Sequence, residues 1–410
     1  MFDALPVALA GNGPALVPLP TASLTTPNDV VQNLLRATRP DDPDAPLEDD
    51  EIAVVLATSG STGAPRGVMH TAASLQALDD QVLQRAKGNA TGARVQWIAA
   101  LPVTSMGGFN VLIRALATGQ APRCIGSIGG LAPFSVDDFA ATVESAVDGS
   151  TALATSLVAA QVRRLLGDPR GCDALRACGL VLVGGGPLPG SVAAAAKDAG
   201  ITLTTTYGAT ETGGGCVFDG RPLMGVQVRL LQADGRLLTP GQSALTPEGL
   251  TGEIVVNGPM LAVGYRCDAQ GSARAFTADG YRTGDIGSWT SEQLLHVQGR
   301  ADDVITVRGT NVALGAVEAV IGALPVVAAV AAIPSGPLDD PAITVCLVLT
   351  EVGDRAAQQA DISALVRAQV REHLGAAATP ASILVTDQLP TLPGGKIDRV
   401  RLRRELAEDR

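Results

Sequence analysis

Four short apolar runs, each followed by a turn rich in glycine or hydroxyl residues, constrain the fold of this 410-residue chain more than any other feature. Runs of this kind are typical of strands buried on both faces of a parallel sheet. Amphipathic or alanine-rich stretches of helical length lie between them. The alternation predicts an α/β sheet whose functional sites lie at the carboxyl ends of the strands. The four runs are Ile52–Ala57, Val95–Leu101, Gly179–Val183 and Ile201–Thr206.

The pattern changes twice along the chain. After about residue 220, short alternating segments such as Val226–Leu231, separated by Gly and Pro, predict antiparallel strands. Further on, strands and helices mix again. We therefore predict a large N-terminal domain at residues 1–301, in which sheets are layered with helices, and a small α+β C-terminal domain at residues 302–410.

Composition excludes several classes of function. Asp and Glu outnumber Lys and Arg by 41 to 30, the formal net charge is −11, and aromatic residues make up only 3% of the chain. Binding to nucleic acid or to an anionic membrane is therefore not expected. The N-terminus lacks the features of a signal peptide and no apolar stretch approaches membrane-spanning length, so we expect a cytoplasmic protein. The scattered cysteines and unpaired histidines predict neither disulfides nor a histidine-rich zinc site.

The loop after Ile52–Ala57 is the sharpest local motif. Its sequence TSGSTGAPRG places the hydroxyls of Ser59, Ser61 and Thr62 among glycines, whose lack of a Cβ lets backbone N–H groups converge on an anion. Arg66 adds a positive charge. The loop is not a Walker A motif, because no Gly-Lys-Ser/Thr follows. A flexible hairpin loop would explain the glycines but not the hydroxyls, so we predict a phosphate-binding loop.

A second hydroxyl-rich loop, TYGATET, follows the run at Ile201–Thr206. The adjacent hydroxyl and carboxylate of Thr210 and Glu211 can hold a phosphoryl oxygen and a Mg²⁺ ion together. Tyr207 offers a flat face to a purine. A helix cap would use the same Thr and Glu, so this loop alone leaves both interpretations open.

Three further segments carry charged residues at expected turns. In YRTGD, a turn is expected to present Asp285 to the two hydroxyls of a ribose, although a solvated turn aspartate has the same sequence. GRADD, which contains Arg300 and Asp302, lies at the predicted domain boundary. PGGKIDR places Lys396, one of only three lysines, on a Gly-Gly loop, where a solvated surface lysine is the ordinary alternative.

In their order and spacing, these five motifs resemble those of the adenylate-forming superfamily, which comprises acyl-CoA synthetases, nonribosomal peptide adenylation domains and luciferases. The resemblance extends from about residue 52 to about residue 403. It implies a mobile C-terminal domain and the adenylation of a carboxylate by ATP. It also implies Mg²⁺ and at least one cation where negative charge builds up in the transition state.

The resemblance implies a role for each motif residue. Glu211 would bind Mg²⁺, Thr210 the α-phosphate, and Arg66, which stands where the superfamily usually has lysine, the β,γ-phosphates. Lys396 would contact the α-phosphate and the reacting carboxylate, and Asp302 would be the hinge residue. The residues implied in binding the phosphates, adenine and ribose are Thr58, Ser59, Gly60, Ser61, Thr62, Gly63, Gly184, Gly185, Gly186, Tyr207, Gly208, Asp285 and Arg300.

The segment YGATETGGGCVFDG, with SLVAAQVRRLL upstream, resembles the o-succinylbenzoate-CoA ligases of menaquinone biosynthesis, above all the short actinobacterial type. This resemblance implies CoA as a co-substrate. Gly213 and Gly214 would leave space for an aromatic ring beside the α-phosphate, although a tight turn needs the same glycines. One position departs from the pattern, because Ser105 stands where those ligases commonly carry histidine. A hydroxyl cannot supply a positive charge to a substrate carboxylate.

The departure at Ser105 leaves the acid open. Either other donors, such as Thr155 or Ser156, hold the second carboxylate of o-succinylbenzoate, or the substrate is a different aryl or acyl acid. A stand-alone adenylation module that loads a carrier protein is a further alternative, against which the absence of a carrier domain argues. The expected partners are thus a small carboxylic acid, ATP and CoA, and a homo-oligomer is left open.

Overall fold

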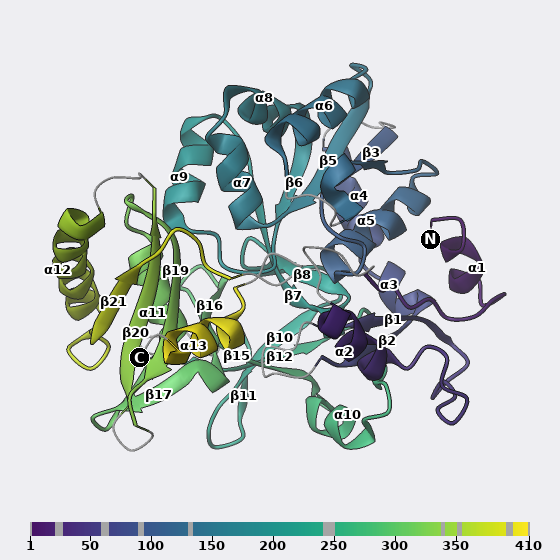
Figure 1. The fold of residues 1–410 in the computed structure, drawn as a ribbon. Coiled ribbons are helices and arrows are strands. Elements are labelled where there is room, and N and C mark those ends of the chain that lie inside the picture. The colour runs from purple at the N-terminus through teal and green to yellow at the C-terminus, as the bar shows by residue number, and fades with distance from the viewer. Residues whose placement is uncertain are drawn as a thin grey trace.

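The computed structural model describes residues 2–20, 28–58, 65–88, 94–129, 134–240, 251–337, 341–350, 355–390 and 397–408. Figure 1 shows a large part that contains the N-terminus and a smaller part, drawn in green and yellow, that contains the C-terminus. The predicted α/β class with a large N-terminal and a small C-terminal part is confirmed. The boundary predicted at residues 301 and 302 falls in the 3₁₀ turn Ala301–Asp303 (η4) and stays a prediction.

The largest sheet has seven strands in the order β4-β3-β5-β6-β7-β8-β9. Strands β3 to β7 are parallel, and β8 and β9 then turn back antiparallel. The parallel prediction is therefore confirmed for three of the four apolar runs, which form β3, β6 and β7. The strand bounds are β3 Arg94–Ala99, β4 Arg123–Cys124, β5 Thr151–Leu157, β6 Cys178–Val183, β7 Thr204–Ala209, β8 Gly214–Phe218 and β9 Arg221–Pro222.

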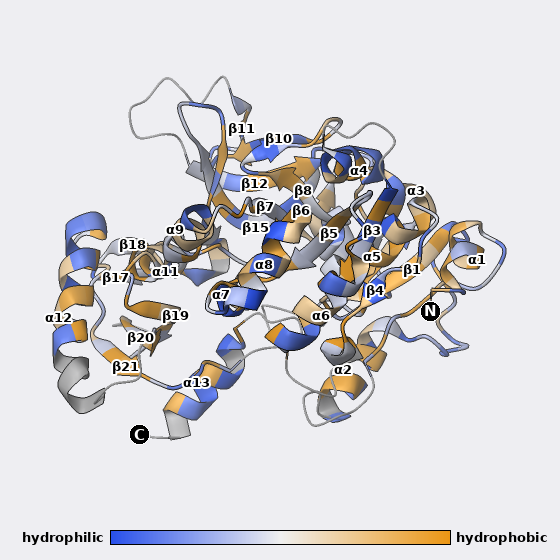
Figure 2. Cartoon of the chain, turned by 90° about the horizontal axis from the view of Figure 1, so that it is seen from above, coloured by the Kyte–Doolittle hydropathy of each residue, from blue (hydrophilic) through white to orange (hydrophobic). Residues whose placement is uncertain are grey.

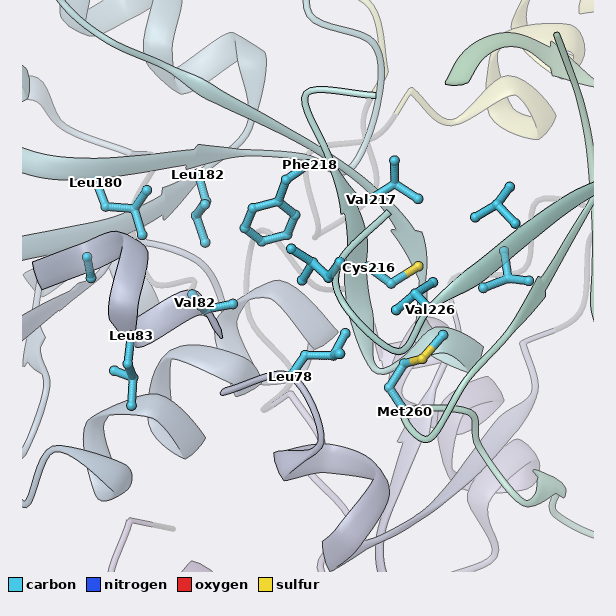
Figure 3. Close-up of a cluster of buried hydrophobic side chains, with 14 of the residues drawn as sticks. Leu78, Val82, Leu83, Leu180, Leu182, Cys216, Val217, Phe218, Val226 and Met260 are labelled. Carbon is cyan, nitrogen blue, oxygen red and sulfur yellow. The ribbon is translucent and has the colours of Figure 1, made fainter. Parts of the chain in front are cut away.

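Helices cover both faces of this sheet (Figure 1). On one face, Leu78 and Val82 pack toward Phe218 in the cluster that Figure 3 shows. On the other face, Phe139 and Leu165 lie in a second buried cluster. The amphipathic stretch after β2 (Gly67–Thr71) is divided into two helices, α3 and α4. The helices are α3 Ala72–Gln76, α4 Asp79–Lys87, α5 Met106–Ala117, α6 Val136–Ala146, α7 Ala159–Leu166, α8 Pro169–Ala177 and α9 Gly190–Asp198, with the 3₁₀ turn η1 Gly126–Gly129.

The first apolar run does not join the seven-stranded sheet, so the prediction of a parallel strand there is wrong. It forms β1 (Ile52–Ala57), which pairs antiparallel with β2 (Gly67–Thr71), and β2 pairs with β13 (Gly264–Tyr265). Helices α1 (Leu5–Leu9), α2 (Asn28–Thr38) and α3 pack against β1. Because these helices cover β1, the strand is as apolar as a central parallel strand although it belongs to a hairpin.

A third sheet, antiparallel as predicted, has the order β11-β10-β12-β15-β14, and β16 pairs with β15. The YRTGD segment lies inside the ten-residue strand β15, so the expectation of a turn at Asp285 is wrong. Gly284 keeps a positive φ of 69° there, which loosens the strand locally. The bounds are β10 Gln227–Leu231, β11 Leu237–Leu238, β12 Thr251–Asn257, α10 Ala269–Ala275, β14 Phe276–Thr277, β15 Gly280–Trp289 and β16 Leu295–Arg300.

The C-terminal part has its own core. A β17–β18 hairpin precedes a sheet of order β19-β20-β21, and the buried cluster between this sheet and its helices includes Leu314, Val345 and Val366. Figure 2 shows blue and orange alternating along α12 and α13. Among the described residues, no helix has the length and apolar character needed to cross a bilayer. The bounds are β17 Val304–Val307, β18 Thr310–Ala313, α11 Leu314–Gly322, β19 Val327–Ser335, β20 Ala342–Leu349, α12 Arg355–Leu374, β21 Ser382–Val385 and α13 Arg399–Glu408.

Candidate active site

The two ends of the predicted phosphate loop meet at the mouth of the β1–β2 hairpin. The N–H of Thr58 donates to the carbonyl of Arg66 over 2.8 Å, and the N–H of Arg66 donates to Thr58 Oγ1 over 3.0 Å. These two bonds close the loop at its base. The other residues predicted to bind phosphate lie outside the described residues, and their roles stay predictions: Ser59, Gly60, Ser61, Thr62 and Gly63.

Arg66 lies over the ring of Tyr265, a residue that sequence reasoning missed. The guanidinium carbon is 4.8 Å from the ring centroid. The Tyr265 hydroxyl donates to Glu211 Oε1 over 3.0 Å, and the two residues are only 3% and 8% exposed. One sequence signal was available: the chain has only three tyrosines, and Tyr207 and Tyr281 lie within two of the predicted motifs.

The surroundings of the three tyrosines keep their hydroxyls protonated. Burial, followed by the neighbouring Glu211 carboxylate, raises the pKa of Tyr265 to about 12 and also raises the pKa of Tyr281. Burial and the Asp285 carboxylate raise the pKa of Tyr207 well above its usual value. At neutral pH all three side chains are therefore hydrogen-bond donors.

The Thr210–Thr212 segment forms a 3₁₀ turn (η2) at the end of β7. Thr212 Oγ1 accepts the N–H of Ala209 over 2.8 Å, which caps the turn from within. The N–H of Ala262 donates to the Glu211 carbonyl over 2.9 Å, so a distant loop fixes the turn from outside. Thr212, and not Thr210 or Glu211, thus supplies the capping side chain, and the roles of Thr210 and Glu211 toward phosphate and Mg²⁺ stay predictions.

His70 is a second residue that sequence reasoning missed. It lies in β2 with no exposed surface, and its Nε2 is 2.7 Å from the Thr210 carbonyl oxygen. A carbonyl only accepts, so Nε2 carries the proton, while Nδ1 lies 3.0 Å from Ser74 Oγ. Burial lowers the pKa of His70 to about 4, against a smaller opposing effect of the Thr210 carbonyl. His70 is therefore a neutral imidazole that holds the turn in place.

Residues from the second, third and fourth motifs meet around Asp285. The Tyr207 hydroxyl donates to Asp285 Oδ2 over 2.8 Å. Arg300 pairs with Asp285 across β15 and β16, at 3.5 Å from Nη1 to Oδ1, and also donates to the Thr283 carbonyl over 2.9 Å. The structure thus brings together the predicted adenine-binding tyrosine and the two predicted ribose-binding residues.

The predicted adenine-binding glycines follow β6 directly, and two of them have a structural reason to be glycine, one in its packing and one in its backbone conformation. The N–H of Gly184 donates to the Leu157 carbonyl over 3.2 Å, and a Cβ there would stand 2.5 Å from Thr206 Oγ1. Gly185 has a φ of +81°. A Cβ at Gly186 would meet open space. At Gly208, a Cβ would overlap backbone atoms of the β7–β8 hairpin.

Three predicted substrate-pocket hydroxyls have other tasks or little access. Ser105 is the N-cap of α5, where its Oγ accepts the N–H of Gly108 over 3.3 Å and donates to the Pro102 carbonyl over 2.7 Å. Thr155 is buried in β5 and donates to the Ile98 carbonyl over 3.0 Å. Ser156 is also buried in β5. Their roles toward a substrate stay predictions.

The predicted pocket glycines pack closely against α5. The Asn110 side-chain amide donates to the Gly213 carbonyl over 2.7 Å. A Cβ at Gly214, whose φ is +96°, would stand 2.5 Å from Asn110 Nδ2 and 3.3 Å from Met106 Cγ. On the side of their Cβ positions the glycines permit a tight turn and a close helix contact, and their role beside an aromatic ring of the substrate stays a prediction.

The two residues predicted to drive domain movement are only partly described. Asp302 belongs to η4, but its side chain lies outside the described residues. The whole of Lys396 also lies outside them. Three residues after Lys396, Arg399 Nη2 donates to both carboxylate oxygens of Glu318 over 2.7 Å each. Arg399 also lies 3.9 Å from the Asp303 carboxylate. Arg399, the last residue of the predicted lysine motif, is therefore attached to α11 and to the residue that follows the predicted hinge residue in η4.

The donor set fits a Mg²⁺ ion that is shared with phosphate. Glu211 Oε1 accepts the Tyr265 hydrogen bond, and among the described residues no hydrogen bond reaches Oε2, which remains able to bind a hard cation. Within the same part of the chain, no three His, Cys, Asp or Glu side chains gather into a metal site. One protein carboxylate suits Mg²⁺, which is commonly held by one or two carboxylates together with substrate phosphates and water.

Two family models match the chain. The model of the AMP-binding enzyme matches residues 13–266, and the model of the AMP-binding enzyme C-terminal domain matches residues 316–396. A probable 2-succinylbenzoate–CoA ligase of Mycobacterium tuberculosis is 35% identical over 410 residues, which cover 99% of this chain and 95% of that protein.

Two solved structures share the fold. The amide bond synthetase McbA from Marinactinospora thermotolerans is 25% identical, with a TM-score of 0.72 over 96% of this chain and 76% of that one. The o-succinylbenzoate CoA synthetase MenE from Bacillus subtilis, in complex with the acyl-adenylate OSB-AMP, is 24% identical, with a TM-score of 0.68 over 86% of this chain and 69% of that one.

Proposed function

This chain belongs to the AMP-binding enzymes, and from this premise we propose that it is an ATP-dependent ligase that joins o-succinylbenzoate to CoA and releases AMP and pyrophosphate. The acid and the thiol are those named for the Mycobacterium tuberculosis relative, which matches almost the whole chain. The structural observation that carries the proposal is the meeting of distant motifs, in which Tyr207 donates to Asp285 beside Arg300, and Glu211 follows on the next turn.

In the first step, a carboxylate oxygen of the acid attacks the α-phosphorus of ATP, and the bond from that phosphorus to the bridging oxygen of pyrophosphate breaks. Asp285 and Arg300 orient the ribose, and the Thr210 hydroxyl contacts the α-phosphate. Arg66 offsets negative charge on the β,γ-phosphates, and Lys396 offsets the charge that builds up at the reacting oxygens. Glu211 would hold Mg²⁺, which supplies further positive charge to the phosphates when bound.

In the second step, the sulfur of CoA attacks the acyl carbon of the adenylate, the thioester bond forms, and AMP leaves with the oxygen that joined it to the acyl group. The small C-terminal part changes its orientation about Asp302 between the two steps, so that Lys396 serves the first step alone. The attachment of Arg399 to Glu318 supports this assignment, because it joins the lysine loop to the body of the C-terminal part.

The site also favours a second candidate, the ligation of a different aryl or acyl acid to CoA. The Ser105 hydroxyl caps α5 and donates to the Pro102 carbonyl, and the Thr155 hydroxyl donates to the Ile98 carbonyl within the sheet. Neither supplies a positive charge to a second carboxylate. An acid with a single carboxylate makes no such demand on the site.

The proposal is tested by supplying the purified protein with ATP, Mg²⁺, CoA and o-succinylbenzoate and identifying the products. We expect the thioester, AMP and pyrophosphate. A panel of other carboxylates in an ATP–pyrophosphate exchange assay, repeated with CoA and with an amine, separates the two candidates and includes amide formation. Thioester formation only with another acid would replace the substrate while sparing the reaction class. Release of ADP in place of AMP would overturn the proposal.

A further inference from the structure

Tyr265 contacts both charged groups that flank the triphosphate in the proposed reaction. Its ring lies under the Arg66 guanidinium, 4.8 Å from centroid to carbon, and its hydroxyl donates to Glu211 Oε1 over 3.0 Å. Arg66 ends the phosphate loop, whereas Glu211 belongs to a turn that lies 145 positions further along the chain. One side chain therefore connects the cation and the anion of the site.

The backbone around Tyr265 is attached to the same two segments. Tyr265 pairs with Val68 in β2, and the N–H of the next residue, Arg266, donates to the Gly67 carbonyl over 2.7 Å. Three residues before Tyr265, the N–H of Ala262 donates to the Glu211 carbonyl over 2.9 Å. The strand that follows the phosphate loop and the turn that carries Glu211 are thus tied to one short segment.

The Tyr265 side chain itself has little freedom. Its ring packs edge-on against Phe276 at a centroid distance of 5.5 Å, and its backbone N–H donates to Ser272 Oγ over 2.8 Å. The residue is almost fully buried. A hydroxyl held in this way fixes the rotation of the carboxylate that accepts from it, and leaves the second carboxylate oxygen, Oε2, to other ligands.

We propose that Tyr265 is a positioning residue that couples Arg66 to Glu211, so that the cation for the β,γ-phosphates and the carboxylate for Mg²⁺ are held as one unit. The inference rests on the proposed function. The planar guanidinium of arginine stacks on an aromatic face better than the compact ammonium of lysine does. The ring of Tyr265 therefore gives a physical reason for an arginine at position 66.

The hydroxyl is tested by Tyr265→Phe, which keeps the ring under Arg66. ATP binding is measured by calorimetry, without acid or CoA, in Mg²⁺ and in EDTA. The Mg²⁺ factor is defined as the Kd of ATP in EDTA divided by the Kd of ATP in Mg²⁺. We expect this factor to fall about tenfold in Tyr265→Phe, the effect of one lost hydrogen bond to a charged group, while binding in EDTA stays the same.

Thr277→Val is the matched control, because it removes a hydroxyl beside Phe276 that donates to the Gly280 carbonyl over 3.0 Å, and the Tyr265–Glu211 bond stays intact. Tyr281 is unsuitable, because its hydroxyl is hydrogen-bonded to that of Tyr265. We expect the Mg²⁺ factor of Thr277→Val to stay within about twofold of the wild type, well below the effect of a lost charged hydrogen bond. Equal factors in the wild type and Tyr265→Phe would refute the coupling. A wild type that fails to bind ATP at all would refute the proposed function instead, so the two failures are distinguishable.

The ring is tested by a double-mutant cycle between Arg66→Lys and Tyr265→Leu. Arg66→Lys should weaken ATP binding in both backgrounds, and about two- to fivefold more when Tyr265 is present than when it is replaced by Leu. This difference corresponds to the free energy of an exposed cation–π contact. Additive effects would mean that the stack has no part in holding Arg66.

If Tyr265→Leu or Tyr265→Phe does not fold, the coupling can still be tested by a measurement on the wild type. With only three tyrosines and two tryptophans in the chain, the near-ultraviolet difference spectrum between ATP with Mg²⁺ and ATP with EDTA reports on Tyr265. A cation bound by Glu211 changes the field at the Tyr265 hydroxyl, so we expect a tyrosine signal that persists in Tyr207→Phe, which removes the other tyrosine hydroxyl at the proposed nucleotide site. A spectrum with no tyrosine signal would count against the proposal.

Discussion

Arg66 is held at the end of the predicted phosphate loop by its stack on Tyr265 and by its backbone bonds to Thr58. We expect Arg66→Ala to raise the KM for ATP and to slow adenylation, about tenfold in kcat/KM if the lost interaction is worth about 1.4 kcal/mol. Arg66→Lys should be milder, because the charge stays while the planar fork is lost. Steady-state kinetics with varied ATP measure both effects. Unchanged ATP kinetics in Arg66→Ala would remove the loop from the site.

His70 makes the stability of the protein depend on pH. Its pKa is about 4 in the folded protein and near the ordinary 6.5 in the unfolded chain, so the unfolded chain takes up the proton first as the pH falls. The stabilisation by neutral His70 is complete above pH 6.5 and is lost as the pH falls toward 4. Urea unfolding should therefore show that His70→Gln loses about 2 kcal/mol less than the wild type between pH 7 and pH 5.

Asp79 acts in the opposite direction over part of this range. Burial raises its pKa to about 6, against the effect of Arg114, so the folded protein gains stability at Asp79 as the pH falls from 6 toward 4. The two effects partly cancel in the wild type, and only the difference between the wild type and His70→Gln isolates His70. Identical pH profiles for the two proteins would show that His70 is not a buried neutral imidazole.

Among the site residues, the sequence predicted those that stand in short local patterns. Hydroxyls among glycines, and a Thr next to a Glu at a strand end, are visible in a few consecutive letters. His70, Asn110 and Tyr265 have no such pattern, because their importance comes from partners 140, 103 and 54 positions away. Only the fold brings these partners together, so sequence spacing could not identify them.

At the scale of elements, α5 and the β7–β8 hairpin approach each other so closely that a side chain larger than the hydrogen of glycine does not fit at position 214. Gly214→Ala would place a methyl group against Asn110 and would strain a positive φ. Gly235→Ala is the matched control, because its φ is +85° and no atom lies within 4 Å of the added Cβ. Thermal or urea unfolding should show that Gly214→Ala loses about 1–3 kcal/mol more than Gly235→Ala. Equal losses would mean that backbone strain alone explains the glycine.

The elements also show where periodicity stops being informative. The apolar runs at β3 and β6 were identified correctly because most of their residues are buried and the strands therefore lack alternation, and the run at β7, whose residues are only partly buried, also joins the parallel sheet. β1 has the same pattern because α1, α2 and α3 cover it, and the run does not say whether its partner is parallel or antiparallel. The YRTGD segment contains Gly and Asp, typical turn residues, yet pairing with β12 and β16 keeps it extended.

At the scale of the whole molecule, the two half-reactions should separate by mutation. Lys396→Ala should lose adenylation by about 10²-fold or more, as expected for a preorganised cation at the reacting oxygens. It should still convert a presynthesised acyl-adenylate and CoA to thioester at a near-normal rate. Lys197→Ala, at an exposed position of α9, is the control for loss of a lysine. Single-turnover experiments time each step.

Asp302→Pro should show the opposite bias. Proline restricts φ within η4, so adenylation should survive while thioester formation falls, because the C-terminal part can no longer change its orientation freely. Both steps are timed in the same single-turnover format. Equal loss of the two steps in each of Lys396→Ala and Asp302→Pro would mean that the lysine loop and the hinge do not form a domain-alternating switch.

The hydrogen bonds that hold the Thr210–Thr212 turn also bear on how the protein is made. During translation the turn leaves the ribosome after His70 but before Tyr265, so its carboxylate has no hydroxyl partner at first. At ordinary elongation rates this interval lasts roughly 3–10 seconds. The Asp285 and Arg300 pair follows later still. A nascent chain therefore has the residues proposed to bind Mg²⁺ and ribose together only after Arg300 has left the ribosome, and Lys396 follows later still.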